Sequence, residues 1–334
     1  MKKIRTALCS FGMSGEVFHG PLLSYDAHYE IVKILERTKE KSKVKYPEAS
    51  IVRSYEEILE DPSMDLVIVN TPHQLHYPMA KEALKRGKHV VVEKPFTVTT
   101  GEGQELIELA KQKGRVLTVF HNKRLEGDFK TIVQLIESKK LGELTSFKAR
   151  FDRYKPTIGP KKWKEEDPLA GGILYDLGSH LIDQALYLFG TPKKIEADLR
   201  IERASSNVID AFDISLEYKN GFKVELGASS LVQNPGPKFL VEGTLGTFIK
   251  NGVDPQEEDL KNGKLPGFSN WGKEAKEDKG ILTYVNGDRE AISTMLGSYE
   301  NFYANLSQAI VEREPLLVLP DEALDVIKLI EQCK

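Results

Sequence analysis

The stretch His89-Val90-Val91-Val92-Glu93-Lys94-Pro95 decides the fold class. Three consecutive valines predict a strand buried on both faces, as in a parallel sheet. The apolar run then ends at a carboxylate, an ammonium group and a proline. Ligands of open α/β sheets lie beyond the carboxyl ends of the strands, and Pro95 restricts the backbone of Lys94. A lone lysine here would ordinarily be a solvated surface group, but the rest of the chain makes Lys94 a candidate site residue.

Further apolar runs and helical stretches alternate along the first third of the chain. Strands are expected over residues 4–9, 31–35, 65–70 and 116–120, helices over 17–23, 78–86 and 103–113, and a short helix after a capping box at 54–57. Strands that alternate with helices predict right-handed βαβ crossovers. We therefore expect an α/β fold in which residues 1–121 form a doubly wound parallel sheet, the Rossmann dinucleotide-binding domain.

The loop after the first strand carries an incomplete dinucleotide fingerprint. The pattern G-x-G-x-x-G falls on Ser10, Gly12 and Gly15, so a serine replaces the glycine of the tight turn. Gly12 still permits close approach of a pyrophosphate, and Gly15 still lets the helix pack on its strand. The N-terminus of that helix also offers N–H groups to an anion. The residues expected to bind the dinucleotide here are Phe11, Gly12, Met13, Ser14 and Gly15.

The end of the second strand offers both acidic and basic groups to the adenosine ribose. Glu36 can bind the ribose hydroxyls of NAD, whereas Arg37 and Thr38 can hold the 2′-phosphate of NADP by charge-assisted hydrogen bonds. An anionic Glu36 disfavours that phosphate unless its side chain turns away. The alternative is that all three side chains face solvent. We expect NADP to be the preferred cofactor, with NAD as the alternative.

Polar residues also follow the strand at 65–70, at another carboxyl end. His73 and His76 have the spacing H-x-x-H, but no third ligand of a zinc site follows nearby. We therefore expect no metal, and we expect this loop to line the nicotinamide side of the site. The residues expected to contact the cofactor are Asn70, Thr71, Pro72, His76, Glu93 and Lys94.

Beyond residue 121 the pattern changes to one helix followed by strands. The helix is expected over residues 128–138, and the strands over 146–152, 195–201, 212–218 and 222–228. Asn220-Gly221 between two alternating runs is a strong hairpin signal. Locally linked antiparallel strands predict a large open sheet with one covered face and one face available to a partner. Residues 122–334 are thus expected to form a second α/β domain, whose last helix can pack back on the first. Its charged stretch 256–279 predicts a mobile surface loop.

A glycine pair and a polar helix face stand inside this second part. After Gly171-Gly172, a helix carries Asp176 and His180 four residues apart, which places both on one face. An aspartate can orient an imidazole and set its pKa, as a general base for a hydroxyl proton requires. The alternative is an ordinary ion pair on the helix surface, which would contribute little.

Composition argues against several classes of function. The 334 residues carry 47 basic and 50 acidic side chains, a formal net charge of −3, so there is no basic excess for nucleic acid. No apolar run reaches the roughly 20 residues of a membrane helix, and Arg5 and Ser10 interrupt any signal-peptide core. Cys9 and Cys333 lie at opposite ends of the sequence, as expected of reduced thiols. We expect a cytoplasmic protein with a small-molecule substrate.

Four motifs occur in order along the chain: the glycine loop, Thr71-Pro72 with His76, Glu93-Lys94-Pro95, and Asp176-x-Gly-x-His180. Together they resemble the glucose–fructose oxidoreductase / inositol dehydrogenase / MocA family of NAD(P)-dependent dehydrogenases. The resemblance covers the whole chain. It is closest to members that have Gly-x-x-Gly-x-Val-Phe-His, here Gly12 to His19, a branch that includes NADP-linked scyllo-inositol dehydrogenases. It implies a C-terminal sheet used for homodimer or homotetramer contacts.

The same resemblance implies that Lys94, Asp176 and His180 are catalytic. The implied reaction is hydride transfer between the nicotinamide and a secondary alcohol or ketone of a polyol, inositol or sugar. His180 would take the hydroxyl proton, and Lys94 would stabilise the developing negative charge. One alternative is a cofactor-binding sensor or regulator of the same fold without turnover. A metal-dependent hydrolase that uses the histidines is another.

Substrate contacts are expected from residues after the strand at 116–120 and from the second domain. Asparagine and arginine side chains suit a polyhydroxylated ligand. Trp163 can stack on a sugar face or lie in the core, and the sequence does not separate these. The expected set is Lys94, Phe120, Asn122, Arg124, Arg153, Tyr154, Trp163, Asp176 and His180.

Overall fold

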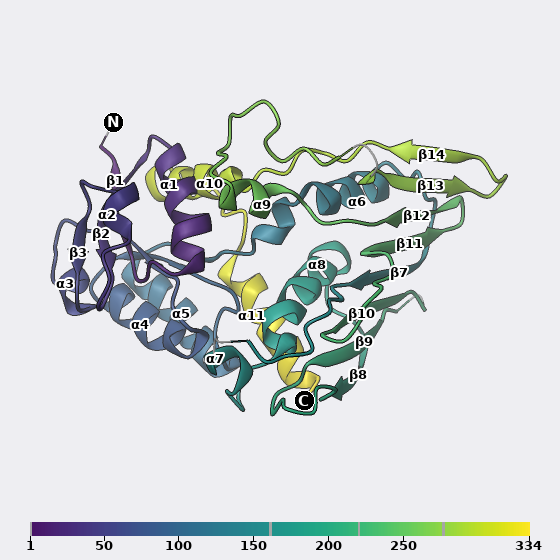
Figure 1. Cartoon of the computed structure of the whole chain (residues 1–334), viewed down its shortest axis with the longest axis horizontal. Coiled ribbons are helices and arrows are strands. Elements are labelled where there is room, and N and C mark those ends of the chain that lie inside the picture. The colour runs from purple at the N-terminus through teal and green to yellow at the C-terminus, as the bar shows by residue number, and fades with distance from the viewer. Residues whose placement is uncertain (1, 160–161, 220, 276–277) are drawn as a thin grey trace. The chain divides into compact units, whose positions relative to one another are not determined.

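Figure 1 shows the computed structural model, which describes residues 2–159, 162–219, 221–275 and 278–334, apart from the side chains of residues 162 and 163. Contacts within the chain divide it into two compact units. The first comprises the chain up to Leu125 together with Gln256–Trp271 and Ser298–Leu324, and the second comprises Glu126–Pro255, Gly272–Gly297 and Asp325–Lys334. Each unit is therefore built from segments that are far apart in the sequence.

The first unit contains a six-stranded parallel sheet in the order β3-β2-β1-β4-β5-β6. Its strands are β1 (Ile4–Leu8), β2 (Tyr29–Leu35), β3 (Ser50–Val52), β4 (Leu66–Val69), β5 (His89–Val92) and β6 (Leu117–Val119). The strand order reverses between β1 and β4, which makes the crevice at their carboxyl ends the usual ligand site of such a sheet. The expected Rossmann sheet is confirmed, with β3 as a strand that the sequence pattern did not predict.

Burial explains the uniform apolar runs of this sheet. All four residues of β4 are buried, and so are Val90, Val91 and Val92 of β5. Helices flank the strands in Figure 1, as crossover connections require. The helices of this unit are α1 (Gly20–Tyr25), preceded by a π-helical turn (Ser14–His19), α2 (Ser42–Lys45), α3 (Glu56–Leu59), α4 (His76–Lys85) and α5 (Thr100–Lys113), together with α9 (Gln256–Lys261) and α10 (Glu300–Val311) from later in the chain.

Local signals mark the helix ends. The capping box expected at residues 54–57 is present, since the Ser54 N–H donates to Glu57 Oε1 at 2.9 Å and the Glu57 N–H donates to Ser54 Oγ at 3.4 Å. Helix α5 begins at a second capping box, formed by Thr99 and Glu102, and ends at Gly114, whose φ of 60° favours glycine. The sequence pattern placed the start of α5 three residues too late, because its first turn is polar.

The prediction of a mobile surface loop over residues 256–279 is wrong for much of its length. Helix α9 occupies its beginning, and Leu260 and Trp271 are buried in the core of the first unit. These two buried side chains lie in a stretch rich in charged residues, so the average composition of the stretch did not indicate their burial. Residues 276 and 277 lie outside the described part.

The second unit contains an eight-stranded sheet in the order β14-β13-β12-β11-β7-β10-β9-β8. Its strands are β7 (Leu144–Arg150), β8 (Lys194–Arg200), β9 (Ala211–Glu217), β10 (Lys223–Ser229), β11 (Phe239–Gly243), β12 (Gly246–Lys250), β13 (Gly280–Tyr284) and β14 (Arg289–Ile292). The sheet is mainly antiparallel, as expected. The exception is β7, which pairs in parallel with β10 because it is inserted between two strands that come much later in the sequence. The predicted hairpin joins β9 to β10, although Asn220 lies outside the described residues.

The two faces of this sheet differ in chemistry. Phe212, Ile214 and Leu216 of β9 are buried, whereas the intervening Asp213 and Ser215 are partly exposed. Helix α8 (Ser179–Phe189) packs on the apolar face, where the Phe189 ring lies 5.3 Å from that of Phe147. The unit also contains α6 (Gly127–Glu137) and the short α7 (Lys162–Glu165). Helix α11 (Pro320–Gln332) is shared: its residues up to Leu324 belong to the first unit and the rest to the second. In the described residues, none of the helices combines the length and hydropathy that a membrane span requires.

Candidate active site

Three hydrogen bonds between Ser10 and Asn70 tie the loop after β1 to the end of β4. Ser10 donates through its N–H to Asn70 Oδ1 at 2.9 Å and through Oγ to the Asn70 carbonyl at 2.7 Å, and Asn70 Nδ2 donates back to the Ser10 carbonyl at 2.9 Å. Neither Ser10 nor Gly12 has a positive φ. The tight turn therefore does not need glycine at position 10, and the serine hydroxyl gives it an additional hydrogen bond.

The two glycines of the loop have different surroundings. A Cβ on Gly15 would lie 2.3 Å from the Ser10 carbonyl oxygen and 2.9 Å from Asn70 Nδ2, so only glycine fits there. A Cβ on Gly12 would meet no atom within 4 Å. Gly15 thus permits the close packing inside the loop, and the space beside Gly12 suits the approach of a bulky phosphate group.

Glu36, at the end of β2, is turned into the protein. Its Oε1 accepts hydrogen bonds from the Ser42 N–H at 2.9 Å and Ser42 Oγ at 2.5 Å, and its Oε2 accepts one from the Lys41 N–H at 3.1 Å. The residue is 7% exposed. Arg37 and Thr38, which follow it, are exposed. The side chains exposed directly after this strand are therefore those of Arg37 and Thr38, and the Glu36 carboxylate is not exposed beside them.

His76 joins two loops at the carboxyl edge of the sheet. Its Nδ1 lies 2.8 Å from the Pro95 carbonyl oxygen and its Nε2 lies 3.0 Å from the Thr71 carbonyl oxygen. Burial lowers the pKa of this imidazole, although both carbonyl groups favour its protonated form. The ring is 1% exposed, so it can influence a cofactor by positioning Thr71 and Pro95. Within the described ranges, no three or more His, Cys, Asp or Glu side chains form a group that could hold a metal ion.

Glu93 and Lys94 follow β5 at the same edge, and Lys94 precedes a cis peptide bond to Pro95. The Glu93 carboxylate contacts His19 Nε2 through Oε1 at 3.0 Å and accepts the Lys94 N–H through Oε2 at 3.0 Å. Burial alone would raise the pKa of Glu93. The hydrogen bond from His19 and the nearby charges, Lys94 among them, outweigh burial and lower that pKa. Glu93 is therefore an anion beneath the loop that carries Lys94.

Asp176 and His180 belong to the second unit. Asp176 lies in a π-helical turn (Leu174–Gly178) that leads into α8, and His180 is 5% exposed. Asp176 Oδ1 accepts a hydrogen bond from Lys164 Nζ at 2.7 Å. Lys164 was not among the predicted site residues, because nothing in its spacing from Asp176 indicates the contact.

Close contacts explain why glycine precedes this helix. Gly172 has a φ of 81°, and a Cβ there would lie 2.2 Å from the Ile209 carbonyl oxygen. The Gly172 N–H donates to the Lys164 carbonyl at 2.7 Å. Lys164 is therefore held through its main chain next to the glycines, while its side chain reaches Asp176.

The other expected substrate-binding residues have varied surroundings. Phe120 is 1% exposed, and Arg124 is buried and donates from Nη1 to Glu322 Oε2 at 2.7 Å. Asn122 is buried, whereas Tyr154 is 55% exposed. Arg153 is only partly buried, and its N–H donates to the Ser229 carbonyl at 3.0 Å. The side chain of Trp163 lies outside the described residues. Arg124 thus binds a carboxylate of the chain itself.

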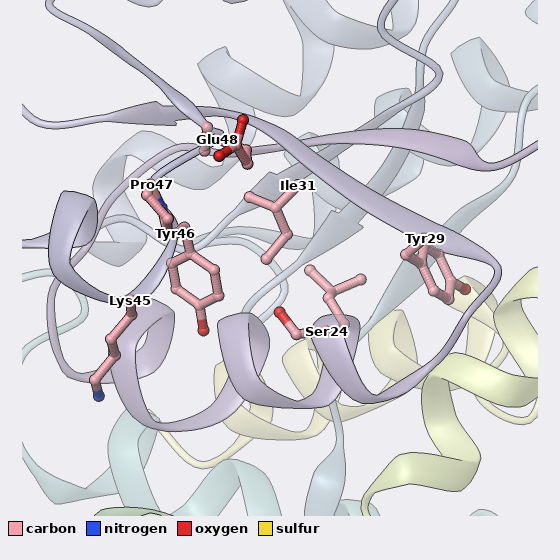
Figure 2. A pocket seen from close by; sticks show the side chains of 9 residues that line it. Ser24, Tyr29, Ile31, Lys45, Tyr46, Pro47 and Glu48 are labelled. Atoms are coloured by element: carbon pink, nitrogen blue, oxygen red, sulfur yellow. The ribbon is translucent and has the colours of Figure 1, made fainter.

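A pocket of about 280 Å³ lies elsewhere in the first unit, against α1 and β2 (Figure 2). It is lined by Leu23, Ser24, Tyr29, Ile31, Lys45, Tyr46, Pro47, Glu48 and Ala49. It contains none of the residues that the sequence predicted for cofactor or substrate. The candidate site in this unit is therefore the carboxyl edge of β1, β4 and β5, which gathers the glycine loop, Asn70, Thr71, Glu93 and Lys94.

Two family domains match the chain. Residues 4–121 match the NAD-binding Rossmann fold of the Gfo/Idh/MocA oxidoreductase family, and residues 133–334 match its C-terminal α/β domain. Among the relatives, scyllo-inositol 2-dehydrogenase (NADP(+)) IolW of Bacillus subtilis is 39% identical over 98% of this chain and 92% of its own length. The Escherichia coli oxidoreductase YdgJ is 38% identical over 98% of this chain and 94% of its own length.

The solved structures agree with this result. The structure of YvaA from Bacillus subtilis superposes with a TM-score of 0.95 at 38% identity, over 99% of this chain and 95% of that one. An oxidoreductase from Bacillus cereus gives a TM-score of 0.89 at 33% identity, over 99% of this chain and 95% of that one. The resemblance indicated by the motifs is confirmed: the chain belongs to the Gfo/Idh/MocA family and is an NAD-binding oxidoreductase.

Proposed function

We propose that the protein is an NADP-preferring dehydrogenase that acts on a secondary alcohol, or the corresponding ketone, of a polyol, inositol or sugar. The observation that carries the proposal is the carboxyl edge of the parallel sheet, where the glycine loop follows β1 and Lys94 follows β5, with only β4 between these two strands. The name of the Bacillus subtilis relative, an NADP-linked scyllo-inositol dehydrogenase, supports the substrate class.

In the proposed mechanism the bound nicotinamide supplies the hydride acceptor or donor. In the oxidation direction His180 takes the hydroxyl proton while the carbon bearing that hydroxyl loses a hydride, which leaves a ketone. Lys94 hydrogen-bonds the reacting oxygen and stabilises its developing negative charge. Asp176 orients His180 or a neighbouring hydroxyl. Lys94 belongs to the first unit and the other two belong to the second, so their joint action is part of the proposal.

The domain roles follow the same proposal. Residues 1–121 bind the cofactor, and residues 122–334 bind the substrate and make homodimer or homotetramer contacts through the open face of the eight-stranded sheet. A row of apolar side chains, Leu240, Ile249 and Ile281, crosses that face in register and supports this assignment. The free, buried thiols of Cys9 and Cys333 fit a cytoplasmic enzyme.

A substrate panel tests the reaction. Purified protein is titrated with NADPH and NADH by fluorescence and then assayed with inositols and aldoses. We expect turnover on at least one of them, and Lys94→Ala should lower kcat about 10²–10³-fold while the Kd for NADPH changes little. Lys113→Ala, which removes an exposed lysine at the end of α5, is the matched control. Equal losses of kcat and cofactor affinity in Lys94→Ala would mean that Lys94 binds the cofactor without stabilising the reacting oxygen. Cofactor binding without turnover on any substrate would favour the sensor hypothesis.

The role of His180 is tested by the pH profile of alcohol oxidation. A neutral imidazole is needed to accept the proton, so the rate should fall on the acidic side. His180→Ala should abolish this acidic limb as well as lower the rate. An unchanged limb in the variant would disprove the assignment.

The preference for NADP rests on the orientation of Glu36. Since its carboxylate is bonded to Ser42 and to the main chain of Lys41, it does not oppose a 2′-phosphate beside Arg37. We expect Arg37→Ala to raise the Kd for NADPH by about 10–100-fold, the range for hydrogen bonds to charged groups, and to leave the Kd for NADH nearly unchanged. Arg289→Ala, at an exposed arginine of β14, is the charge-matched control. Equal effects on both cofactors would contradict the assignment.

A further inference from the structure

His19 is a buried histidine at the end of the π-helical turn that follows the glycine loop. It is 0% exposed and contacts side chains from two distant segments of the first unit. Its Nδ1 lies 2.6 Å from the Tyr303 hydroxyl on α10, and its Nε2 lies 3.0 Å from Glu93 Oε1 after β5. The mechanism proposed above does not use this histidine.

The chemistry of the two partners determines which ring nitrogen carries the proton. Glu93 is a carboxylate and can only accept, so His19 Nε2 must be the donor. Burial raises the pKa of Tyr303 well above its usual value, so its hydroxyl keeps its proton and can donate to Nδ1. An imidazole with its proton on Nε2 and an acceptor at Nδ1 satisfies both contacts, with hydrogen bonds that run from Tyr303 through His19 to Glu93.

Both ends of this row of hydrogen bonds are held by further contacts. At one end, the Tyr29 hydroxyl donates to the Tyr303 carbonyl at 2.7 Å, and the Phe120 ring packs 4.7 Å from the His19 ring. At the other end, the second oxygen of Glu93 accepts the Lys94 N–H at 3.0 Å. The carboxylate is thus held between the imidazole and the main chain of Lys94, and movement of His19 would release one side of it.

We propose that Tyr303 and His19 are positioning residues that hold the Glu93 carboxylate and, through it, the main chain from which the Lys94 ammonium reaches the reacting oxygen. The proposal rests on the function proposed above. If His19 contributed only to stability, any well-packed apolar side chain at position 19 could replace it. Positioning requires specifically the N–H donor that faces Glu93.

The test compares His19→Gln with His19→Leu. Glutamine has an N–H donor at nearly the position of Nε2, whereas leucine fills similar space without one. We expect His19→Leu to lower kcat by on the order of 10–100-fold, the scale of a misplaced catalytic group, while the Kd for NADPH stays within about threefold. His19→Gln should recover most of kcat. Equal kcat values in both variants and the wild type would overturn the proposal, and so would equal losses in the two variants.

Tyr303→Phe provides a milder variant that is expected to fold, since it removes a single oxygen atom. It should lower kcat less than His19→Leu, because the imidazole still donates to Glu93 but loses the hydroxyl that holds its Nδ1. Tyr218→Phe, which removes a hydroxyl that donates to the Gly190 carbonyl at 3.2 Å in the second unit, is the control and should leave kcat unchanged. A Tyr303→Phe enzyme with wild-type kcat would also overturn the proposal.

Nuclear magnetic resonance separates this proposal from the proposed reaction. Nitrogen-15 shifts should show His19 protonated at Nε2, and the Lys94 amide signal should move in His19→Leu but not in His19→Gln. These readouts need no turnover. A wild-type protein without activity would therefore refute the dehydrogenase, while an unmoved Lys94 amide in His19→Leu would refute the positioning role.

Discussion

The two sheets of this protein bury their strands in different ways. In the parallel sheet of the first unit, β4 is apolar and buried along its whole length, and β5 is apolar and buried from Val90 to Val92. In the mixed sheet of the second unit, β9 from Phe212 onward and the first four residues of β10 alternate between buried apolar residues and exposed or partly exposed polar ones. Polar groups of the first sheet therefore gather at the strand ends, whereas those of the second spread over an open face.

The surroundings of charge differ accordingly. The Glu93 carboxylate at the edge of the parallel sheet is 13% exposed and has a buried histidine as its partner. Lys148 and Glu225 on the open face are 41% and 53% exposed and form an ion pair of 2.7 Å across β7 and β10. Water screens the second pair but not the first. Ionisable groups at the strand ends can thus be held in one geometry, whereas ion pairs on the open face contribute little to the free energy of unfolding.

The largest expected difference comes from one substitution made in both sheets. Ile68 of β4 is 0% exposed, whereas Ile249 of β12 is 38% exposed, and each strand has a partner on both sides. Ile68→Ala should lower the free energy of unfolding by about 2–5 kcal/mol, because it removes buried methyl groups and leaves a cavity. Ile249→Ala should change it by only about 0.5 kcal/mol. Urea unfolding measures both.

The same pair of variants also tests the proposed oligomer. If a second copy covers the open face, Ile249→Ala should make stability depend more strongly on protein concentration and shift the oligomer in sedimentation experiments. If Ile249→Ala lowered the free energy of unfolding as much as Ile68→Ala at every protein concentration, the proposed difference between the two sheets would be wrong.

A pH effect is expected at the start of β5. Burial lowers the pKa of His89 to about 4, and its Nδ1 accepts the Val116 N–H at 2.9 Å, which requires an unprotonated nitrogen. The unfolded chain binds the proton near pH 6.5 and the folded chain only near pH 4, so this contribution is complete above pH 6.5 and is lost as the pH falls to about 4. The loss should be at most about 3 kcal/mol, since His89 is only partly buried.

His89→Asn isolates this effect, because its side-chain oxygen can still accept the Val116 N–H but does not titrate. Unfolding free energies of wild type and variant, measured from pH 7 to pH 4, should converge or cross as the pH falls. Parallel curves would show that His89 has an ordinary pKa in the folded protein.

The smallest expected effect is on the open face. Lys148→Ala or Glu225→Ala should lower the free energy of unfolding by less than about 1 kcal/mol, and the coupling between them in a double-mutant cycle should shrink further at high salt. A coupling well above this value would mean that the pair is shielded from water, as contact with another chain would produce.

Much of the fold could be predicted from sequence because its signals are local. The valines of β5, the capping box at Ser54 and the Asn-Gly turn between β9 and β10 each depend on neighbouring residues. The parallel pairing of β7 with β10 and the burial of Trp271 could not be predicted, since both depend on segments far away in the chain.

The candidate site divides in the same way. The positions of Gly12, Gly15, Glu93 and Lys94 after strands were predictable from the period of the apolar runs. The contact between His19 and Tyr303 was not, because the two residues are 284 positions apart. The motif Gly-x-x-Gly-x-Val-Phe-His marked His19, but no spacing indicates its partner.

By itself, the sequence determined the class of fold, the family and the residue types at the strand ends, because period, turn chemistry and motif order are written in adjacent residues. The tertiary structure alone decided that Glu36 turns inward and that Glu93 is held between His19 and the main chain of Lys94. The physical reason is that a carboxylate takes its orientation and its pKa from the donors around it, and folding brings those donors together from distant parts of the chain.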